Sequence, residues 1–126
     1  MSGFAFDANI LIDALAGYPP ARTEIERAVG LASRPWISRM VWIEVLSKGS
    51  EALVQDALAF LSRFGIDEID DEIAHRAAAL RRERTRLRST DAIILATAQI
   101  RGRVLITRNT EDFPAAMPGI RVPYIL

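Results

Sequence analysis

Four acidic residues lie at places in the chain where a carboxylate could take part in catalysis. Asp7 directly follows a short apolar run, Asp91 opens an apolar helix, Glu44 lies inside an apolar segment, and Asp112 follows a β-branched run. If these carboxylates met, two unit charges about 4 Å apart would repel by roughly 4 kcal/mol at an effective dielectric of about 20. Protons or cations would relieve that repulsion. The pattern is therefore compatible with an acidic pocket that binds a cation.

The composition limits which cation and which chemistry such a pocket could use. The chain has no cysteine and a single histidine, His75, so disulfides, thiolate metal sites and thiol nucleophiles are excluded. Ligands that are mainly carboxylate oxygens suit Mg²⁺ or Mn²⁺. A divalent cation held by carboxylates lowers the pKa of a bound water and shields charge on a phosphate, which suits hydrolysis of a phosphodiester.

Each acid also has a simpler structural interpretation. Asp7 and Asp91 could stabilise the first turns of helices, where unsatisfied N–H groups favour negative charge. Asp112 could serve a turn. Glu44 could pair with an arginine such as Arg39, because an unpaired buried carboxylate is costly. Spacing alone does not decide between these roles and a shared pocket.

Short apolar strands alternate with helices along the chain. We expect strands at 4–6, 36–38, 66–69, 103–107 and 122–126, and helices at 9–17, 21–32, 40–46, 51–64, 71–87 and 89–102, with a break at Pro19 and Pro20. This alternation indicates an α/β fold with a mainly parallel sheet, whose ligands lie beyond the carboxyl ends of the strands. No repeat or linker interrupts the chain, so we expect a single domain over residues 1–126.

Charge and hydropathy define the setting of this domain. The net charge is zero, which provides no overall attraction to nucleic acid. Arginines nevertheless crowd into residues 76–88, either as a solvated helix face or as a surface for phosphates beside Asp91. Apolar runs are shorter than the roughly 20 residues of a membrane span. With no secretory signal at its start, we expect a cytoplasmic protein.

Several segments together resemble a known family. The segments FAFDANILIDAL, ISRMVWIEVL and STDAIILATAQIRGRVLITRNTEDF are similar to the PIN domain, above all to the ribonuclease toxins of bacterial VapBC toxin–antitoxin pairs. The similarity covers essentially the whole chain, and residues 89–113 are its most specific part. It implies a three-layer α/β/α sandwich around a mainly parallel central sheet.

The resemblance also implies roles for individual residues. The catalytic acids would be Asp7, Glu44, Asp91 and Asp112. Asp7 and Asp91 would be the principal ligands of Mg²⁺ or Mn²⁺. The supporting polar residues would be Asn9, Thr107 and Asn109. Family members differ in whether the last acidic position matches Asn109 or Asp112, so both remain candidates.

The activity implied is that of a metal-dependent endoribonuclease toxin, acting on transfer RNA or a ribosomal RNA loop. A VapB-like antitoxin would inhibit it, and the toxin would form a homodimer. The candidate RNA contacts are Arg84, Arg86 and Arg88. Apolar side chains that belong either to the core or to partner surfaces are Tyr18, Trp36, Trp42, Leu53 and Phe60.

Two other functions fit parts of the pattern. One is a catalytically weak PIN-fold binding module that acts through a protein partner. The other is a phosphatase or a receiver domain with an acidic Mg²⁺ pocket. A receiver needs a lysine at the end of a late strand, and Lys48, the only lysine, lies in another element.

Overall fold

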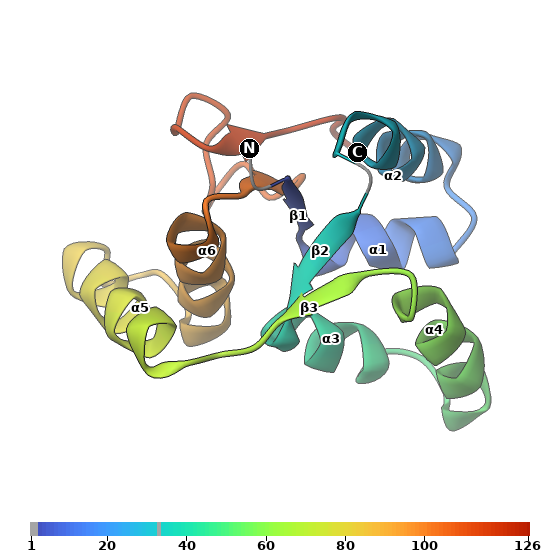
Figure 1. Ribbon diagram of the computed structural model, residues 1–126, viewed down its shortest axis with the longest axis horizontal. Coiled ribbons are helices and arrows are strands. Elements are labelled where there is room, and N and C mark those ends of the chain that lie inside the picture. The colour runs from blue at the N-terminus through green and yellow to red at the C-terminus, as the bar shows by residue number, and fades with distance from the viewer. Residues whose placement is uncertain (1–2, 33) are drawn as a thin grey trace.

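The computed structural model describes residues 3–32 and 34–126, and a parallel sheet lies at its centre (Figure 1). The sheet has five strands in the order β3-β2-β1-β4-β5, and every neighbouring pair is parallel. The strands are β1 (Phe4–Phe6), β2 (Pro35–Ser38), β3 (Gly65–Asp67), β4 (Val104–Ile106) and β5 (Ile120–Arg121). The predicted parallel sheet is thus confirmed.

Strand order reverses at the central strand β1. Phe4 is in register with Pro35 of β2 on one side and with Val104 of β4 on the other. The chain moves outward from β1 to β2 and β3, and then crosses to the opposite side for β4 and β5. The carboxyl ends of β1 and β4 therefore flank the point where strand order reverses, which is where ligands of open α/β sheets bind.

Helices cover both faces of this sheet. They are α1 (Ala8–Leu15), α2 (Pro19–Ala32), α3 (Arg39–Leu46), α4 (Val54–Leu61), α5 (Asp71–Glu83) and α6 (Ser89–Arg101), with a short 3₁₀ turn, η1 (Glu51–Leu53), before α4. Figure 1 shows α5 and α6 on one side of the sheet and α1, α2 and α4 on the other. This arrangement confirms the predicted α/β/α sandwich.

Local side-chain chemistry sets several helix ends. Asp7 is the N-cap of α1 and accepts a hydrogen bond from the N–H of Ala8 at 2.8 Å. Ser38 caps α3 in the same way through the N–H of Met40, and Asp70 caps α5. Gly102 ends α6 with φ of 69°, a left-handed conformation that glycine adopts without a steric cost.

Some predicted boundaries are wrong. Pro19 and Pro20 form the start of α2 instead of a break between helices. Proline is tolerated there because the N–H groups of the first helical turn have no partner within the helix. Helix α5 ends at Glu83 instead of continuing to residue 87. The last strand comprises Ile120 and Arg121, whereas residues 122–126, predicted as a strand, form no regular element.

The apolar side chains of the strands and inner helix faces form one core. Of the five apolar residues assigned to core or partner surfaces, Tyr18, Trp42 and Phe60 pack against this core, and Trp36 is half-buried. Leu53 is 55% exposed. Within the part of the chain that the structure describes, no helix is both long and apolar enough to cross a membrane.

Candidate active site

The centre of the candidate site is Asp7, which directly follows β1 at the point where strand order reverses. The side chain is buried, and Thr107, at the end of β4, donates a hydrogen bond from its hydroxyl to Asp7 Oδ2 at 2.8 Å. Asn9 donates from Nδ2 to the same oxygen at 3.3 Å. Asp7 therefore caps α1 with one oxygen and faces polar residues with the other, so its structural and functional roles are compatible.

The loop after β4 holds the second acid close to this point. The N–H of Asn109 donates to Thr107 Oγ1 at 3.0 Å. Asn109 Nδ2 donates to Asp112 Oδ2 at 2.9 Å, and Asn109 Oδ1 accepts from the N–H of Asp112 at 3.2 Å. Asn109 thus orients Asp112, which gives both candidates for the last acidic position a place at the site.

The third acid, Asp91, lies in the first turn of α6 and is 4% exposed. Arg88 Nε donates to Asp91 Oδ2 at 3.1 Å. Burial raises the pKa of Asp91, the hydrogen bond and charge of Arg88 oppose that shift, and the neighbouring Asp112 raises the pKa further. The net shift is upward, and the contribution of Asp112 to it means that the two carboxyl groups lie close together.

Glu44 projects from α3 and completes this group of acids. Burial raises its pKa, and the negative charges of Asp7 and Asp91 raise it further, against the opposing charges of Arg88 and Lys48. The predicted alternative of a pair with Arg39 is wrong, because Arg39 donates to the Glu68 carboxylate through Nε and Nη2. Burial and the two acids outweigh the two cations, so the pKa of Glu44 is raised.

We call Asp7, Glu44, Asp91 and Asp112 the acidic cluster. Burial raises the pKa of Asp7, and the charge of Asp91 adds to that shift. As the side chains lie, no three His, Asp or Glu residues in the described ranges 3–32 and 34–126 have the mutual arrangement of a metal site. The donor chemistry nevertheless fits a hard divalent cation, because the cluster offers only oxygens and the cation would relieve their repulsion.

The three arginines predicted to contact RNA lie differently around the cluster. Arg88 pairs with Asp91, and Arg84 Nη2 donates to the backbone carbonyl of Asp112 at 2.6 Å. Arg86 is exposed in the turn between α5 and α6. The role of Arg88 in RNA binding stays a prediction, and its pair with Asp91, three residues further along the chain, was not predicted.

A family model describes almost all of this structure. The model of the PIN domain matches residues 4–116, a range that includes the acidic cluster and β1 to β4. The chain belongs to the PIN-domain family. A search of curated proteins finds no significant match.

Solved structures similar to this PIN domain come from toxin–antitoxin complexes. A toxin–antitoxin complex from Klebsiella pneumoniae contains a chain with 40% identity and a TM-score of 0.85, covering 98% of this chain and 99% of that one. DNA-bound VapBC from Salmonella typhimurium follows, with 30% identity, a TM-score of 0.73 and 96% of each chain covered. These findings confirm the predicted resemblance to VapC-type PIN toxins.

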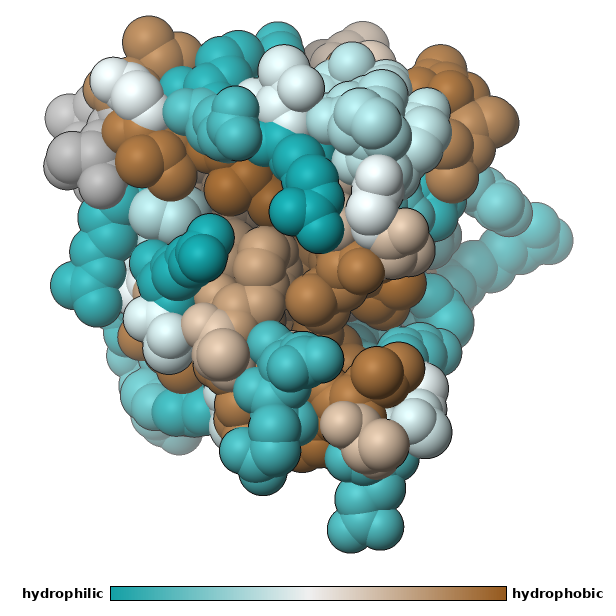
Figure 2. All heavy atoms as spheres, turned by 90° about the vertical axis from the view of Figure 1, so that its right-hand side faces the viewer, coloured by the Kyte–Doolittle hydropathy of each residue, from teal (hydrophilic) through white to brown (hydrophobic). Residues whose placement is uncertain are grey.

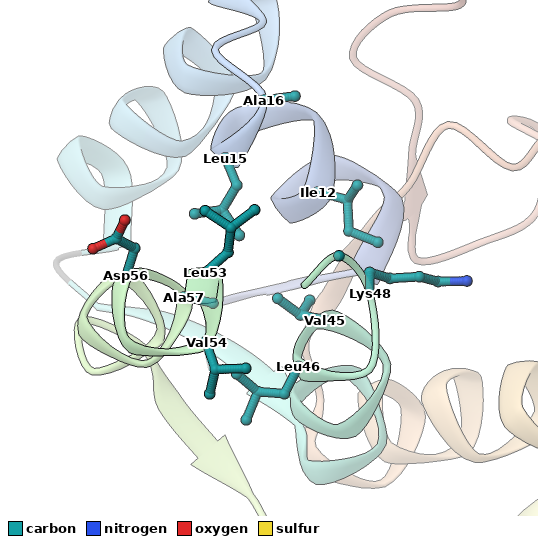
Figure 3. A pocket seen from close by; sticks show the side chains of 11 residues that line it. Ile12, Leu15, Ala16, Val45, Leu46, Lys48, Leu53, Val54, Asp56 and Ala57 are labelled. Atoms are coloured by element: carbon teal, nitrogen blue, oxygen red, sulfur yellow. The ribbon is translucent and has the colours of Figure 1, made fainter. Parts of the chain in front are cut away.

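The PIN domain has a second feature away from the acids, an apolar groove between α1, α3 and the η1–α4 segment (Figure 3). Its volume is about 370 Å³. The apolar side chains that line it are Ile12, Leu15, Val45, Leu46, Leu53 and Val54, with Lys48 and Asp56 among them. Leu15 is 37% and Leu53 55% exposed. Figure 2 shows apolar residues gathered in a hollow on the corresponding side of the molecule.

Proposed function

We propose that this PIN domain is a divalent-metal-dependent endoribonuclease toxin of the VapC type. The observation that carries the proposal is the meeting of four acids from four separate elements at the point where strand order reverses. Burial and neighbouring acids raise the pKa values of Asp7, Glu44 and Asp91, and this concentration of negative charge supports the proposal. Such sites in clefts are candidates for function.

The residues of the cluster have distinct parts in this proposal. Asp7 and Asp91 would hold Mg²⁺ or Mn²⁺, and Glu44 and Asp112 would complete the pocket and orient water. When bound, the cation supplies an activated water and neutralises charge on the phosphate. Thr107 and Asn9 keep the Asp7 carboxylate oriented, and Arg88 limits the movement of Asp91.

The direct test is cleavage of RNA by the purified protein. We expect transfer RNA or a ribosomal RNA fragment to be cut in the presence of Mn²⁺ or Mg²⁺, and cleavage to stop when EDTA removes the metal. Ca²⁺ is the matched control, because it also prefers oxygen ligands but accepts a looser geometry. Cleavage that continues in EDTA would contradict the proposal.

A second candidate is a catalytically weak PIN module that acts through a protein partner. It is favoured by the open arrangement of the acids, among which the described residues provide no three-ligand site. The two candidate functions predict different effects of Mn²⁺ on the thermal midpoint of unfolding. A nuclease that binds Mn²⁺ should be stabilised by it in proportion to the logarithm of metal concentration, whereas a module without a metal site should not.

RNA binding is proposed for the arginines beside Asp91, and Arg86 provides the cleanest test because it is exposed. Arg86→Glu should weaken RNA binding at low salt and reduce the slope of log affinity against log salt by about 1. Arg22→Glu, an exposed arginine on α2, is the matched control. Filter binding across a salt series measures both. Equal effects of the two variants would mean that Arg86 has no specific role.

We propose that a cognate VapB-like antitoxin inhibits the protein. We also propose that the toxin is a homodimer, and light scattering would measure its mass in solution. The similar structures are themselves toxin–antitoxin complexes, and the apolar groove offers a surface for an apolar segment of such a partner. The proposed occupant is the antitoxin, whose binding would cover the exposed Leu15 and Leu53.

Leu53→Glu should therefore leave the toxicity of the protein unchanged but weaken its inhibition by the antitoxin. The substitution should lower affinity for the antitoxin about tenfold, since loss of one apolar anchor costs more than about 1 kcal/mol. Growth of cells that express toxin and antitoxin together measures this. Leu31→Glu, 68% exposed on α2 and outside the groove, is the control. If the antitoxin still inhibits the Leu53→Glu variant completely, the antitoxin does not bind in this groove.

A further inference from the structure

Arg108 occupies a special place in the loop after β4, between two residues that hold acids. The preceding Thr107 donates to Asp7, and the following Asn109 donates to Asp112. Any movement of the backbone at position 108 therefore moves the partners of both carboxylates. The contacts that fix Arg108 therefore also help to set the distance between Asp7 and Asp112.

Helix α1 binds Arg108 at two points. The N–H of Arg108 donates to Asn9 Oδ1 at 3.3 Å. The Arg108 guanidinium donates to Asp13 through Nε at 2.7 Å and through Nη2 at 3.1 Å. Asn9 and Asp13 are four residues apart and lie one above the other on the same helix face. The backbone and side chain of Arg108 are thus fixed to the helix that Asp7 caps.

The C-terminal tail also contacts Asp13, through Tyr124. Tyr124 donates from its hydroxyl to Asp13 Oδ2 at 2.7 Å, and its ring packs edge-on against Tyr18 at 5.2 Å. Burial alone would raise the pKa of Asp13, but the hydrogen bonds of Arg108 and Tyr124 outweigh it and lower the pKa. Asp13 therefore remains charged at neutral pH and keeps both partners.

We infer that Asp13, Arg108 and Tyr124 are positioning residues, which hold the loop of Thr107, Asn109 and Asp112 at a fixed distance from Asp7. The inference rests on the proposed nuclease function for its effect on catalysis. It assigns the C-terminal tail a role at the active site, although Tyr124 bonds to no member of the acidic cluster. It also assigns Arg108 to the protein itself rather than to RNA, because Asp13 neutralises its charge.

The test compares three variants of the full chain with a matched control. Asp13→Asn and Tyr124→Phe remove hydrogen bonds from the network, and Arg108→Lys keeps the charge but loses the two-point geometry. The control is Arg121→Gln, which breaks a similar pair: Arg121 donates to Glu24 at 2.7 and 3.0 Å and joins β5 to α2. Cleavage of bulk transfer RNA with Mn²⁺ is measured, together with hydrogen exchange of the amides of residues 107–113.

We expect kcat to fall about tenfold to a hundredfold in Asp13→Asn and Arg108→Lys, since a misplacement of about 1 Å costs that much. The loss in Tyr124→Phe should be smaller, KM should stay within about twofold, and amides 107–113 should exchange faster. Arg121→Gln should lower the thermal midpoint but leave kcat and the amides of residues 108–113 unchanged. The amide of Thr107 is left out of this comparison, because it donates to the backbone carbonyl of Arg121 at 3.0 Å. If Asp13→Asn does not fold, Tyr124→Phe carries the test, because it removes a single hydroxyl.

Unchanged exchange at residues 107–113 in Asp13→Asn would overturn the inference. So would a raised KM in Arg108→Lys with a wild-type kcat in Asp13→Asn, because that result would make Arg108 a contact to RNA. A wild-type protein that cleaves no RNA would refute the proposed function instead. Hydrogen exchange would then decide alone whether the network holds the loop.

Discussion

Asp7→Asn is expected to remove RNA cleavage while the fold persists. Asp7 is the acid in the acidic cluster with the most fixed position, since it accepts hydrogen bonds from Ala8, Asn9 and Thr107. An amide cannot supply the negative charge that binds a divalent cation. Loss of a group that merely supports a ligand costs about 10–100-fold in metal affinity or activity, so loss of a principal ligand should cost at least about a hundredfold.

The fold should tolerate this substitution for local reasons. Asparagine caps helices about as well as aspartate, so the bond from the N–H of Ala8 survives. The bond from the hydroxyl of Thr107 is lost opposite the new NH₂ group, because Thr107 Oγ1 already accepts from Asn9 Nδ2 and from the N–H of Asn109. Because burial raises the pKa of Asp7, its charge is unfavourable in the metal-free protein, and removal of the charge should offset the lost bond and keep the thermal midpoint close to that of the wild type.

Cleavage assays with Mn²⁺ and thermal unfolding without metal measure the two effects separately. Asp71→Asn is the matched control, because the Asp71 carboxylate is exposed on α5, far from β1 in the fold. An Asp7→Asn protein that cleaves RNA at the wild-type rate would refute the proposed role of this acid. The thermal midpoint shows whether a loss of activity comes from unfolding.

The parts of the fold that the sequence predicted depend on neighbours in the chain. The strand at 4–6 and the helix at 89–102 were predicted from local apolar patterns, and the structure confirms both as β1 (Phe4–Phe6) and α6 (Ser89–Arg101). Alternation of strands and helices then fixes a parallel sheet, whose strand ends share one edge. That rule places Asp7 and the loop after β4 at the same edge of the sheet, whereas the pairing of β1 with β4, which brings them together, is seen only in the structure.

The parts that it missed depend on partners distant in the chain. An ion pair of Glu44 with Arg39 was predicted because both residues lie on α3. Arg39 instead binds Glu68, which follows β3. Asp13 carried no signal because its partners, Arg108 and Tyr124, lie near the other end of the chain. No pattern of hydropathy or spacing encodes such pairs. Strand β5 was misplaced for a similar reason, since its two residues are defined by pairing with β4 rather than by a run of apolar residues.

Phe113→Ala is expected to have the largest effect on stability among substitutions next to the site. Phe113 immediately follows Asp112, and its side chain is among the largest that are fully buried. It is the point at which the loop after β4 enters the core. Truncation of a buried phenylalanine costs about 3–5 kcal/mol through lost burial and the cavity that remains. In a domain with a total stability of about 5–15 kcal/mol, much of the margin would disappear.

Urea unfolding measures this loss, and Phe113→Leu provides the matched variant that conserves most of the volume and should cost less than about 1.5 kcal/mol. Met117→Ala is a second control, because Met117 lies in the same loop but is only partly buried. A loss below about 1 kcal/mol in Phe113→Ala would mean that hydrogen bonds alone hold the loop. The bond from the N–H of Phe113 to the carbonyl of Asn109 remains in every variant, so a large loss isolates the contribution of the buried ring.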